Sequence, residues 1–272
     1  MTIDRLIMSY LSPQQFVKAL VDSGQVKTQQ PTSQLLVSGF LAGAILAIAA
    51  AFAISVSVIT GSMLLGAVLF PVGFIMLNLL GVDLLTGVFV TAPLAWINNG
   101  ENTRLSKVFR SWLVVFIGNF LGALSVVFLF AFFTTYGFSI EPNMIGIKIA
   151  QIGESRTLGY AQYELAGWMS VFVGGVLCNW MVSMGILGSK ISTSVTGKAL
   201  AMWMPIMLFF FMGFEHAVVN MFLFPAAITM GANFTVVDFF VWNEIPVLLG
   251  NLFGGLVLTA LPLYYLYGDK SN

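Results

Sequence analysis

Two acidic residues, Asp83 and Glu215, stand inside long apolar stretches, and the only histidine of the chain, His216, directly follows the second of them. Ionisable side chains are costly in a lipid bilayer, so those that occur there usually serve transport. Imidazole also gains or loses a proton near neutral pH. We therefore predict that His216 acts directly on a small solute or a proton that crosses a membrane.

Both acidic residues stand in glycine-containing frames, which read GVDLLTG at 81–87 and GFEHAVVN at 213–220. Gly81, Gly87 and Gly213 predict irregular backbone at each acid, and a helix breaks in lipid only where protein covers the break or a cavity passes it. We expect the two carboxylates to support the breaks by accepting hydrogen bonds from main-chain N–H groups, as N-caps do. Direct lining of a pore is the alternative.

A new half-helix is expected to start after each break. Its N-terminus carries about half an elementary positive charge, so two such ends that meet at the midplane would favour an anion. Thr86 places a hydroxyl at the first break. Asn119 and Asn251 occupy matching places in later apolar stretches, and we predict that their amides bond to the broken backbone.

The composition predicts an all-α integral membrane protein, because 58% of the 272 residues are hydrophobic and only 8% are charged. Soluble domains carry about a quarter charged residues, and each bilayer crossing needs about 20 apolar ones. The apolar stretches predict six transmembrane helices, of which the second and fifth are broken. These stretches cover residues 35–59, 63–97, 108–135, 165–188, 199–230 and 244–267.

The chain repeats itself at an interval of 132 positions without a gap. Because each half holds three crossings, the second enters the membrane from the opposite side, which predicts an inverted 3+3 repeat with halves at about 34–135 and 164–268. Residues 136–163 are expected to form a partly ordered loop. The repeated residues are Gly43, Gly81, Asp83, Pro93, Gly118, Asn119 and Gly122, which recur as Gly175, Gly213, Glu215, Pro225, Gly250, Asn251 and Gly254.

The charge distribution predicts the orientation. Nine of the eleven basic residues lie in the N-terminal tail (1–33), the second and fourth connections or the C-terminal tail (269–272). The positive-inside rule then places both termini in the cytoplasm. Residues 12–26 are predicted to form a short amphipathic helix, which lies on the membrane surface or packs against protein.

Several other classes of protein lack support in the sequence. The zero net charge gives no attraction to nucleic acid. The single cysteine, Cys178, excludes an internal disulfide and a zinc cluster, and we predict no metal and no cofactor. Water channels need two Asn-Pro-Ala triplets, and this chain contains none. Ammonium channels need two pore histidines, and this chain has a single histidine. Ser170 and Ser183 lack the setting of a hydrolase nucleophile, so an enzyme is not expected.

The segments GVDLLTG, GFEHAVVNMF and the two GNxxG elements resemble the formate/nitrite transporter family, in order, over residues 35–267. The resemblance implies an aquaporin-like protomer that forms a homopentamer with one pore in each protomer. It also implies passage of small monovalent anions or their weak acids. Nitrite is placed slightly ahead of formate because FPVGF at 70–74 and the long outer loop are most similar to nitrite-transporting members. Hydrosulfide and a proton-coupled carboxylate symporter are the alternatives.

The resemblance also implies the site. Thr86 and His216 would form a central pair, with Glu215 and Asn251 holding Thr86 and Asn179 near His216. A proton would be exchanged at His216. The lysine that other members place before the fourth span has no clear match, because the aligned stretch holds Tyr163 and Glu164 and Arg156 lies farther upstream. The implied constrictions consist of Phe70 and Phe209 on the outer side and of Phe74, Leu85 and Val182 on the inner side of a cell inner (plasma) membrane.

Overall fold

The computed structural model describes residues 9–98 and 103–268, and helices dominate both stretches. The first half of the chain contains α1 (Pro13–Gln29), α2 (Thr32–Thr60), α3 (Met63–Leu69), α4 (Pro71–Leu80), α5 (Leu85–Asn98) and α6 (Leu105–Thr134). Between the halves lie α7 (Met144–Ser155) and α8 (Leu158–Ala161). The second half contains α9 (Glu164–Ile191), α10 (Val195–Phe211), α11 (Ala217–Thr229), α12 (Val236–Phe239), η1 (Phe240–Glu244), α13 (Ile245–Gly255), η2 (Leu256–Ala260) and α14 (Leu261–Tyr267).

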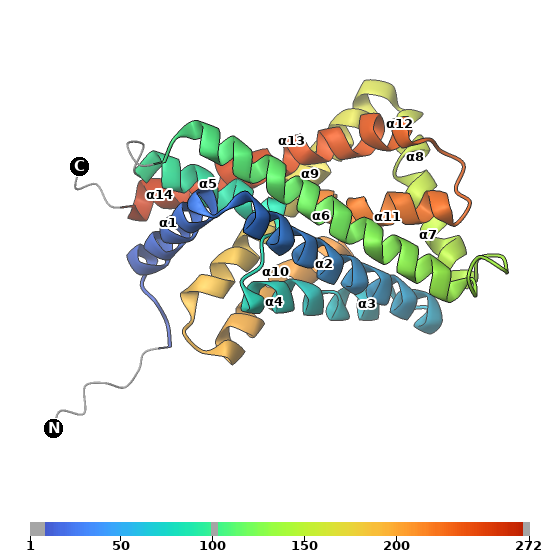
Figure 1. Ribbon diagram of the computed structural model, residues 1–272, viewed down its shortest axis with the longest axis horizontal. Coiled ribbons are helices and arrows are strands. Elements are labelled where there is room, and N and C mark those ends of the chain that lie inside the picture. Colours follow the sequence, from blue (N-terminus) through green and yellow to red (C-terminus); the bar gives the residue numbers. More distant parts are fainter. Residues whose placement is uncertain (1–8, 99–102, 269–272) are drawn as a thin grey trace.

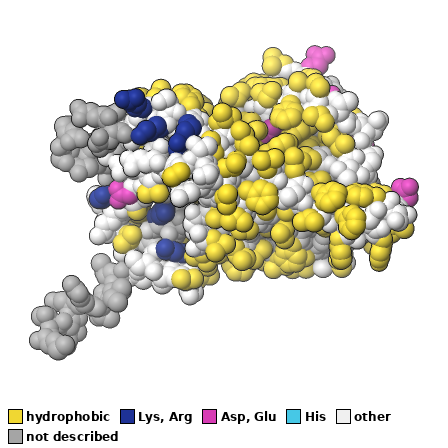
Figure 2. All heavy atoms as spheres, in the orientation of Figure 1, with side chains coloured by type: hydrophobic (Ala, Val, Ile, Leu, Met, Phe, Trp, Pro, Cys, Tyr) yellow, Lys and Arg dark blue, Asp and Glu magenta, His cyan; other side chains and the backbone are white. Residues whose placement is uncertain are grey.

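The helices make six membrane crossings, as predicted. Five helical stretches of the described chain are long and apolar enough to span a bilayer: α2, α3–α4, α6, α9 and the continuous run α12–α14. The shorter α5 continues the second crossing, and α10 with α11 forms the fifth. Hydrophobic side chains cover most of the face seen in Figure 2, while Lys and Arg side chains gather at its left end.

The two broken crossings run in opposite directions (Figure 1). From the right end of the view α3 and α4 run inward, and α5 continues to the left end. From the left end α10 runs inward, and α11 continues to the right. Both α5 and α11 therefore begin inside the molecule and point to opposite ends, which is the inverted repeat.

The glycines correct the predicted register in the first crossing. A Cβ on Gly39 would lie 3.2 Å from Gly118 Cα and 3.4 Å from Val115 Cα. A Cβ on Gly175 would lie 3.3 Å from Gly250 Cα and 3.2 Å from Val247 Cα. Gly175 thus corresponds in space to Gly39, and the predicted pairing of Gly175 with Gly43 is wrong. The four-residue difference is about one helical turn, so both residues lie on nearly the same helix face.

The N-terminal helix α1 packs against protein. Ser12 caps it, with Gln15 completing a capping box, and it ends at Gln29 rather than near residue 26. Its apolar residues Val17 and Leu20 are buried, and α5 is its main neighbour. Of the two alternatives for this amphipathic helix, the structure shows packing on the protein.

The connection between the halves is helical, so the predicted loop at 136–163 is wrong. Asn143 caps α7 through hydrogen bonds from the main-chain N–H groups of Ile145 and Gly146. The helix α7 packs on α11, and α8 turns the chain toward α9. This connection therefore covers α11, the second half of the fifth crossing.

Candidate functional site

An amide from α6 holds the first break. Gly81 ends α4 with φ +73°, in the left-handed region that favours glycine. Asn119 Oδ1 accepts a hydrogen bond from Leu85 N at 2.9 Å, at the start of α5. Asn119 Nδ2 donates to Gly39 O at 2.7 Å and to Asp83 O at 3.0 Å. One side chain thus satisfies two main-chain groups that the break would leave unpaired in lipid, Leu85 N and Asp83 O, and anchors them to α2 through Gly39 O.

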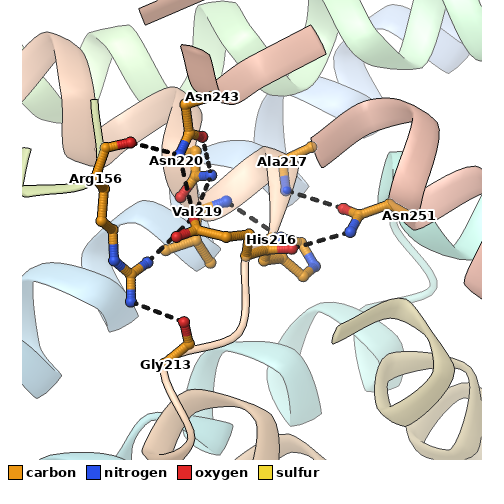
Figure 3. Close-up of polar contacts among 9 residues, drawn as sticks. Arg156, Gly213, His216, Ala217, Val219, Asn220, Asn243 and Asn251 are labelled. Carbon is orange, nitrogen blue, oxygen red and sulfur yellow. Dashed lines mark hydrogen bonds and ion pairs between the residues drawn. The ribbon is translucent and has the colours of Figure 1, made fainter. Parts of the chain in front are cut away.

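The second break has the same construction (Figure 3). Gly213 has φ +69° and follows α10. Asn251 Oδ1 accepts from Ala217 N at 3.0 Å, while Asn251 Nδ2 donates to Gly175 O at 2.8 Å and to Glu215 O at 2.9 Å. The structure therefore gives both asparagines the bonds to broken backbone that the sequence predicted.

The carboxylates do not cap these half-helices, and this expectation is wrong. Asp83 forms an ion pair with Lys27 of α1 and accepts a bond from Ser38 Oγ at 2.7 Å. Glu215 Oε2 accepts from Arg156 Nη1 at 3.4 Å and from the amides of Asn220 at 3.1 Å and Asn243 at 3.3 Å. The donors are side chains in both cases, because the asparagines already occupy the helix starts.

Thr86 and His216 meet between the two breaks. Thr86 Oγ1 lies 3.2 Å from His216 Nε2, and both side chains are buried. His216 Nδ1 accepts a hydrogen bond from Val219 N at 3.2 Å, which caps α11. An accepting Nδ1 assigns the proton of the neutral ring to Nε2, so the ring donates to Thr86. The hydroxyl proton of Thr86 then remains available to an anion.

Two implied contacts differ from the observed ones. Glu215 and Asn251 were expected to hold Thr86, but their side chains bind the partners given above. Asn179 takes that position: its Nδ2 donates to Thr86 O at 3.3 Å and to Asn251 O at 2.6 Å. Asn179 therefore contacts the main chain of Thr86 and links the two breaks.

Cavities approach the central pair from both ends. The larger, of about 750 Å³, lies at the α7 end and reaches Phe209 and His216, with Lys148 and Arg156 in its wall. The smaller, of about 400 Å³, lies at the α1 end and reaches Phe74 and Gly87, with Lys27 and Lys190 in its wall. The wall of the smaller cavity also holds Asp22 and Asp83, which balance its two lysines. No described acid lines the larger cavity, so its basic residues attract anions toward the middle of the protein.

Aromatic rings stand beside the central pair where the larger cavity reaches it. The rings of Phe70 and Phe209 lie 5.7 Å apart at 87°, and Phe209 stacks on His216 at 5.5 Å. At the other end Phe74 lines the smaller cavity together with Leu84 and Ile186. Leu85 and Val182, expected at the inner constriction, are buried, and neither lines the smaller cavity.

The charged partners of the two acids were missed in the sequence. Arg156 was placed too far upstream, but it directly follows α7, where its guanidinium also donates to Gly213 O at 3.2 Å (Figure 3). Lys27 was assigned only to the tail. The repeat gave no signal for them, since the cation precedes its acid by 56 positions for Lys27 and by 59 for Arg156, so the two cations do not occupy equivalent positions.

A family model described as "Formate/nitrite transporter" matches residues 14–265. The chain belongs to the formate/nitrite transporter family. The resemblance drawn from the motifs is confirmed. Because this family consists of transporters and channels, the chain is a multi-pass membrane protein of anion transport and is not an enzyme.

Characterised and predicted transporters are similar over nearly the whole chain. The uncharacterized transporter YrhG of Bacillus subtilis is 32% identical, covering 97% of each chain. A probable formate transporter of Methanothermobacter thermautotrophicus is 31% identical, covering 95% of this chain and 98% of its own. The formate channel FocA of Haemophilus influenzae is 32% identical, covering 84% and 85%.

Solved structures share the fold. A pentameric formate channel with formate bound has a TM-score of 0.72 at 26% identity, covering 88% of this chain and 98% of its own. An FNT family ion channel has a TM-score of 0.78 at 21% identity, covering 93% and 98%. The latter likeness concerns the fold alone.

Proposed function

We propose that the protein is a formate channel that passes the anion, or formic acid, through a pore within each protomer of a homopentamer. The contact between Thr86 and His216, set between two half-helix starts and two cavities, carries this proposal. Formate-named relatives and a pentameric structural neighbour support the substrate and the assembly. The expectation that nitrite precedes formate stays untested, and nitrite and hydrosulfide become competitors in the assay.

The passage of the anion follows from the charges. Basic residues concentrate the anion in the larger cavity, and the partial positive charges of α5 and α11 favour it at the centre. There the hydroxyl of Thr86 donates a hydrogen bond to it, while His216 Nε2 keeps the hydroxyl oriented. The apolar constrictions expected at Phe70 and Phe74 favour the neutral acid over the bare anion, because the anion must shed its water there.

Proton exchange at His216 is the second part of the proposal. A ring that already donates through Nε2 gains a proton only at Nδ1, which accepts from Val219 N. Protonation therefore requires that this cap bond opens, at a cost of about 1 kcal/mol or more. The alternative, a proton-coupled symporter, differs from a channel because each anion crosses together with one proton. This coupling holds also at a saturating concentration of substrate.

We further propose that the end of the molecule with α1 and α14 faces the cytoplasm of a cell whose plasma (inner) membrane holds the protein. These helices lie together, with the rings of Phe16 and Tyr267 6.5 Å apart. The gathering of basic side chains at this end (Figure 2) supports the orientation by the positive-inside rule.

The test is flux into liposomes that hold the purified protein, with formate, nitrite and hydrosulfide supplied separately. Thr86→Val keeps the shape of the side chain and removes its hydroxyl, so we expect formate flux to fall about tenfold to a hundredfold. The matched control is Thr259→Val in the sixth crossing, another buried threonine, whose hydroxyl donates to Gly254 O. Equal flux in the two variants would reject the role of Thr86, and absence of formate flux in the unmodified protein would reject the substrate.

A further inference from the structure

A buried carboxyl group lies behind the second break and takes no part in the pathway described above. Glu244 ends the π-helix η1 in the sixth crossing, and its side chain has no exposed surface. Neither of its carboxyl oxygens has a hydrogen-bond partner among the described residues. An ionised carboxylate without partners is strongly disfavoured at such a place, so this group needs a proton or a ligand.

The surroundings of Glu244 offer it no cation. Glu215 is the charged group that acts on it electrostatically, and Arg156 already pairs with Glu215. The elements packed against η1 are α8, α9, α11, α12 and α13. Of these, α11 and α13 carry no titratable side chain. The titratable groups on the other three are Tyr160 of α8, Glu164, Cys178 and Lys190 of α9, and Asp238 of α12, which is bonded to Thr235.

The network nearest to Glu244 in the chain contains further unpartnered acceptors. The adjacent Asn243 receives a bond from Asn220 at 2.7 Å and donates to Glu215, so η1 joins Glu244 to the network of Figure 3. In this network Glu215 Oε1 and Asn220 Oδ1 also lack hydrogen-bond partners, and both are acceptors. One added proton would turn an acceptor into a donor and would cancel the excess negative charge of two carboxyls beside one guanidinium.

We infer that Glu244 is a proton-binding site, at which one proton from water is held on the Glu244 carboxyl group, beside the network that contains Glu215. With the proton bound, the two carboxyls and Arg156 are together neutral. When the proton leaves to solvent, a negative charge appears behind the central pair and repels the entering anion. Anion flux should therefore fall as the pH rises. Because this effect on flux rests on the proposed function, the proton site needs a readout of its own.

Infrared spectroscopy of the protein in liposomes gives that readout, through the C=O stretching band of a protonated carboxyl group. We expect this band at about pH 7, where solvent-exposed acids are ionised, and we expect Glu244→Gln to remove it. Glu141→Gln is the matched control, since Glu141 is exposed between α6 and α7. Absence of the band from the unmodified protein overturns the inference, and so does a band that persists in Glu244→Gln.

Flux supplies the second arm. Gln mimics the protonated carboxyl at every pH. In Glu244→Gln, the pH at which formate flux falls should therefore increase by about one unit, or the fall should disappear. Glu141→Gln should keep the profile of the unmodified protein. An unchanged profile in Glu244→Gln overturns the coupling to transport. Absence of formate flux in the unmodified protein rejects the proposed substrate, while the infrared band still decides the proton site. Glu244→Leu, which fills the space with an apolar group, replaces Glu244→Gln if the latter fails to assemble.

Discussion

The two helix breaks share their amide support and differ in their charged partners. Asn119 and Asn251 each make the same three kinds of bond to the backbone. At the first break the acid pairs with a lysine from the N-terminal helix and lines a cavity. At the second break the acid is 1% exposed and lies within amides and an arginine.

This difference shows that the geometry and the electrostatics of the two breaks depend on different residues. The positions of the half-helix starts depend on the asparagines, which are the same in both halves. The charge near each start depends on residues outside the repeat, namely α1 and the connection between the halves. Duplication therefore preserved the pore geometry, while the single imidazole and its drier acid make the two sides of the centre unequal.

The largest expected effect comes from removing the amides. Asn251→Leu leaves Ala217 N and Glu215 O without these partners in a dry interior, which costs about 1–3 kcal/mol for each group. We expect that the variant, and Asn119→Leu equally, fails to give a folded protein in detergent, measured by thermal unfolding and size-exclusion chromatography. Asn78→Leu, at a half-buried residue, is the control. If Asn251→Leu folded while Asn119→Leu did not, the two asparagines would not be equivalent supports of their breaks.

The charged partners should give the next largest effect, and an unequal one. Arg156→Met leaves Glu215 unpaired and dry, so we expect a loss of about 3–5 kcal/mol in the free energy of unfolding. Lys27→Met should cost less, because Asp83 lines a cavity from which water reaches it. Adding Glu215→Gln to Arg156→Met should restore most of the loss. Thermal unfolding of all four proteins measures this, and a larger loss for Lys27→Met would reverse the comparison.

Alanine substitutions of the glycines that define the register of the first crossing should have the smallest effect. A Cβ on Gly43 would lie 2.1 Å from Asn119 O, whereas one on Gly39 would lie 3.2 Å from Val115 O and one on Gly175 3.0 Å from Val247 O. We therefore expect Gly43→Ala to destabilise by about 1–3 kcal/mol, and Gly39→Ala and Gly175→Ala by less. If Gly43→Ala and Gly175→Ala proved equally costly, the ungapped repeat would describe the packing better than the corrected register.

Much of the fold can be predicted from the sequence because a lipid bilayer permits few backbone conformations. Apolar length predicts the crossings, and paired glycines predict the breaks at Gly81 and Gly213. Asn119 and Asn251 were predicted to bond to the broken backbone because a buried amide requires partners. The one-turn difference between Gly39 and Gly43 was invisible, since a shift of about one turn places a glycine on nearly the same face.

The charged partners were not readable for a different reason. The placement of Arg156 depends on how α7 and α8 fold over the second break, and that path is set by tertiary packing of a segment that reads as a loop. Asn220 and Asn243 come from separate crossings, and neither position repeats in the other half. Long-range pairs of this kind leave no periodic pattern in a single sequence.

The order of the charged partners along the chain bears on how the protein is made. Lys27 precedes Asp83 by 56 positions, and Arg156 precedes Glu215 by 59. A ribosome releases the chain from its N-terminus, so each cation leaves the tunnel before the acid that it neutralises. Neither acid therefore enters the bilayer during biosynthesis before its counter-ion has been made.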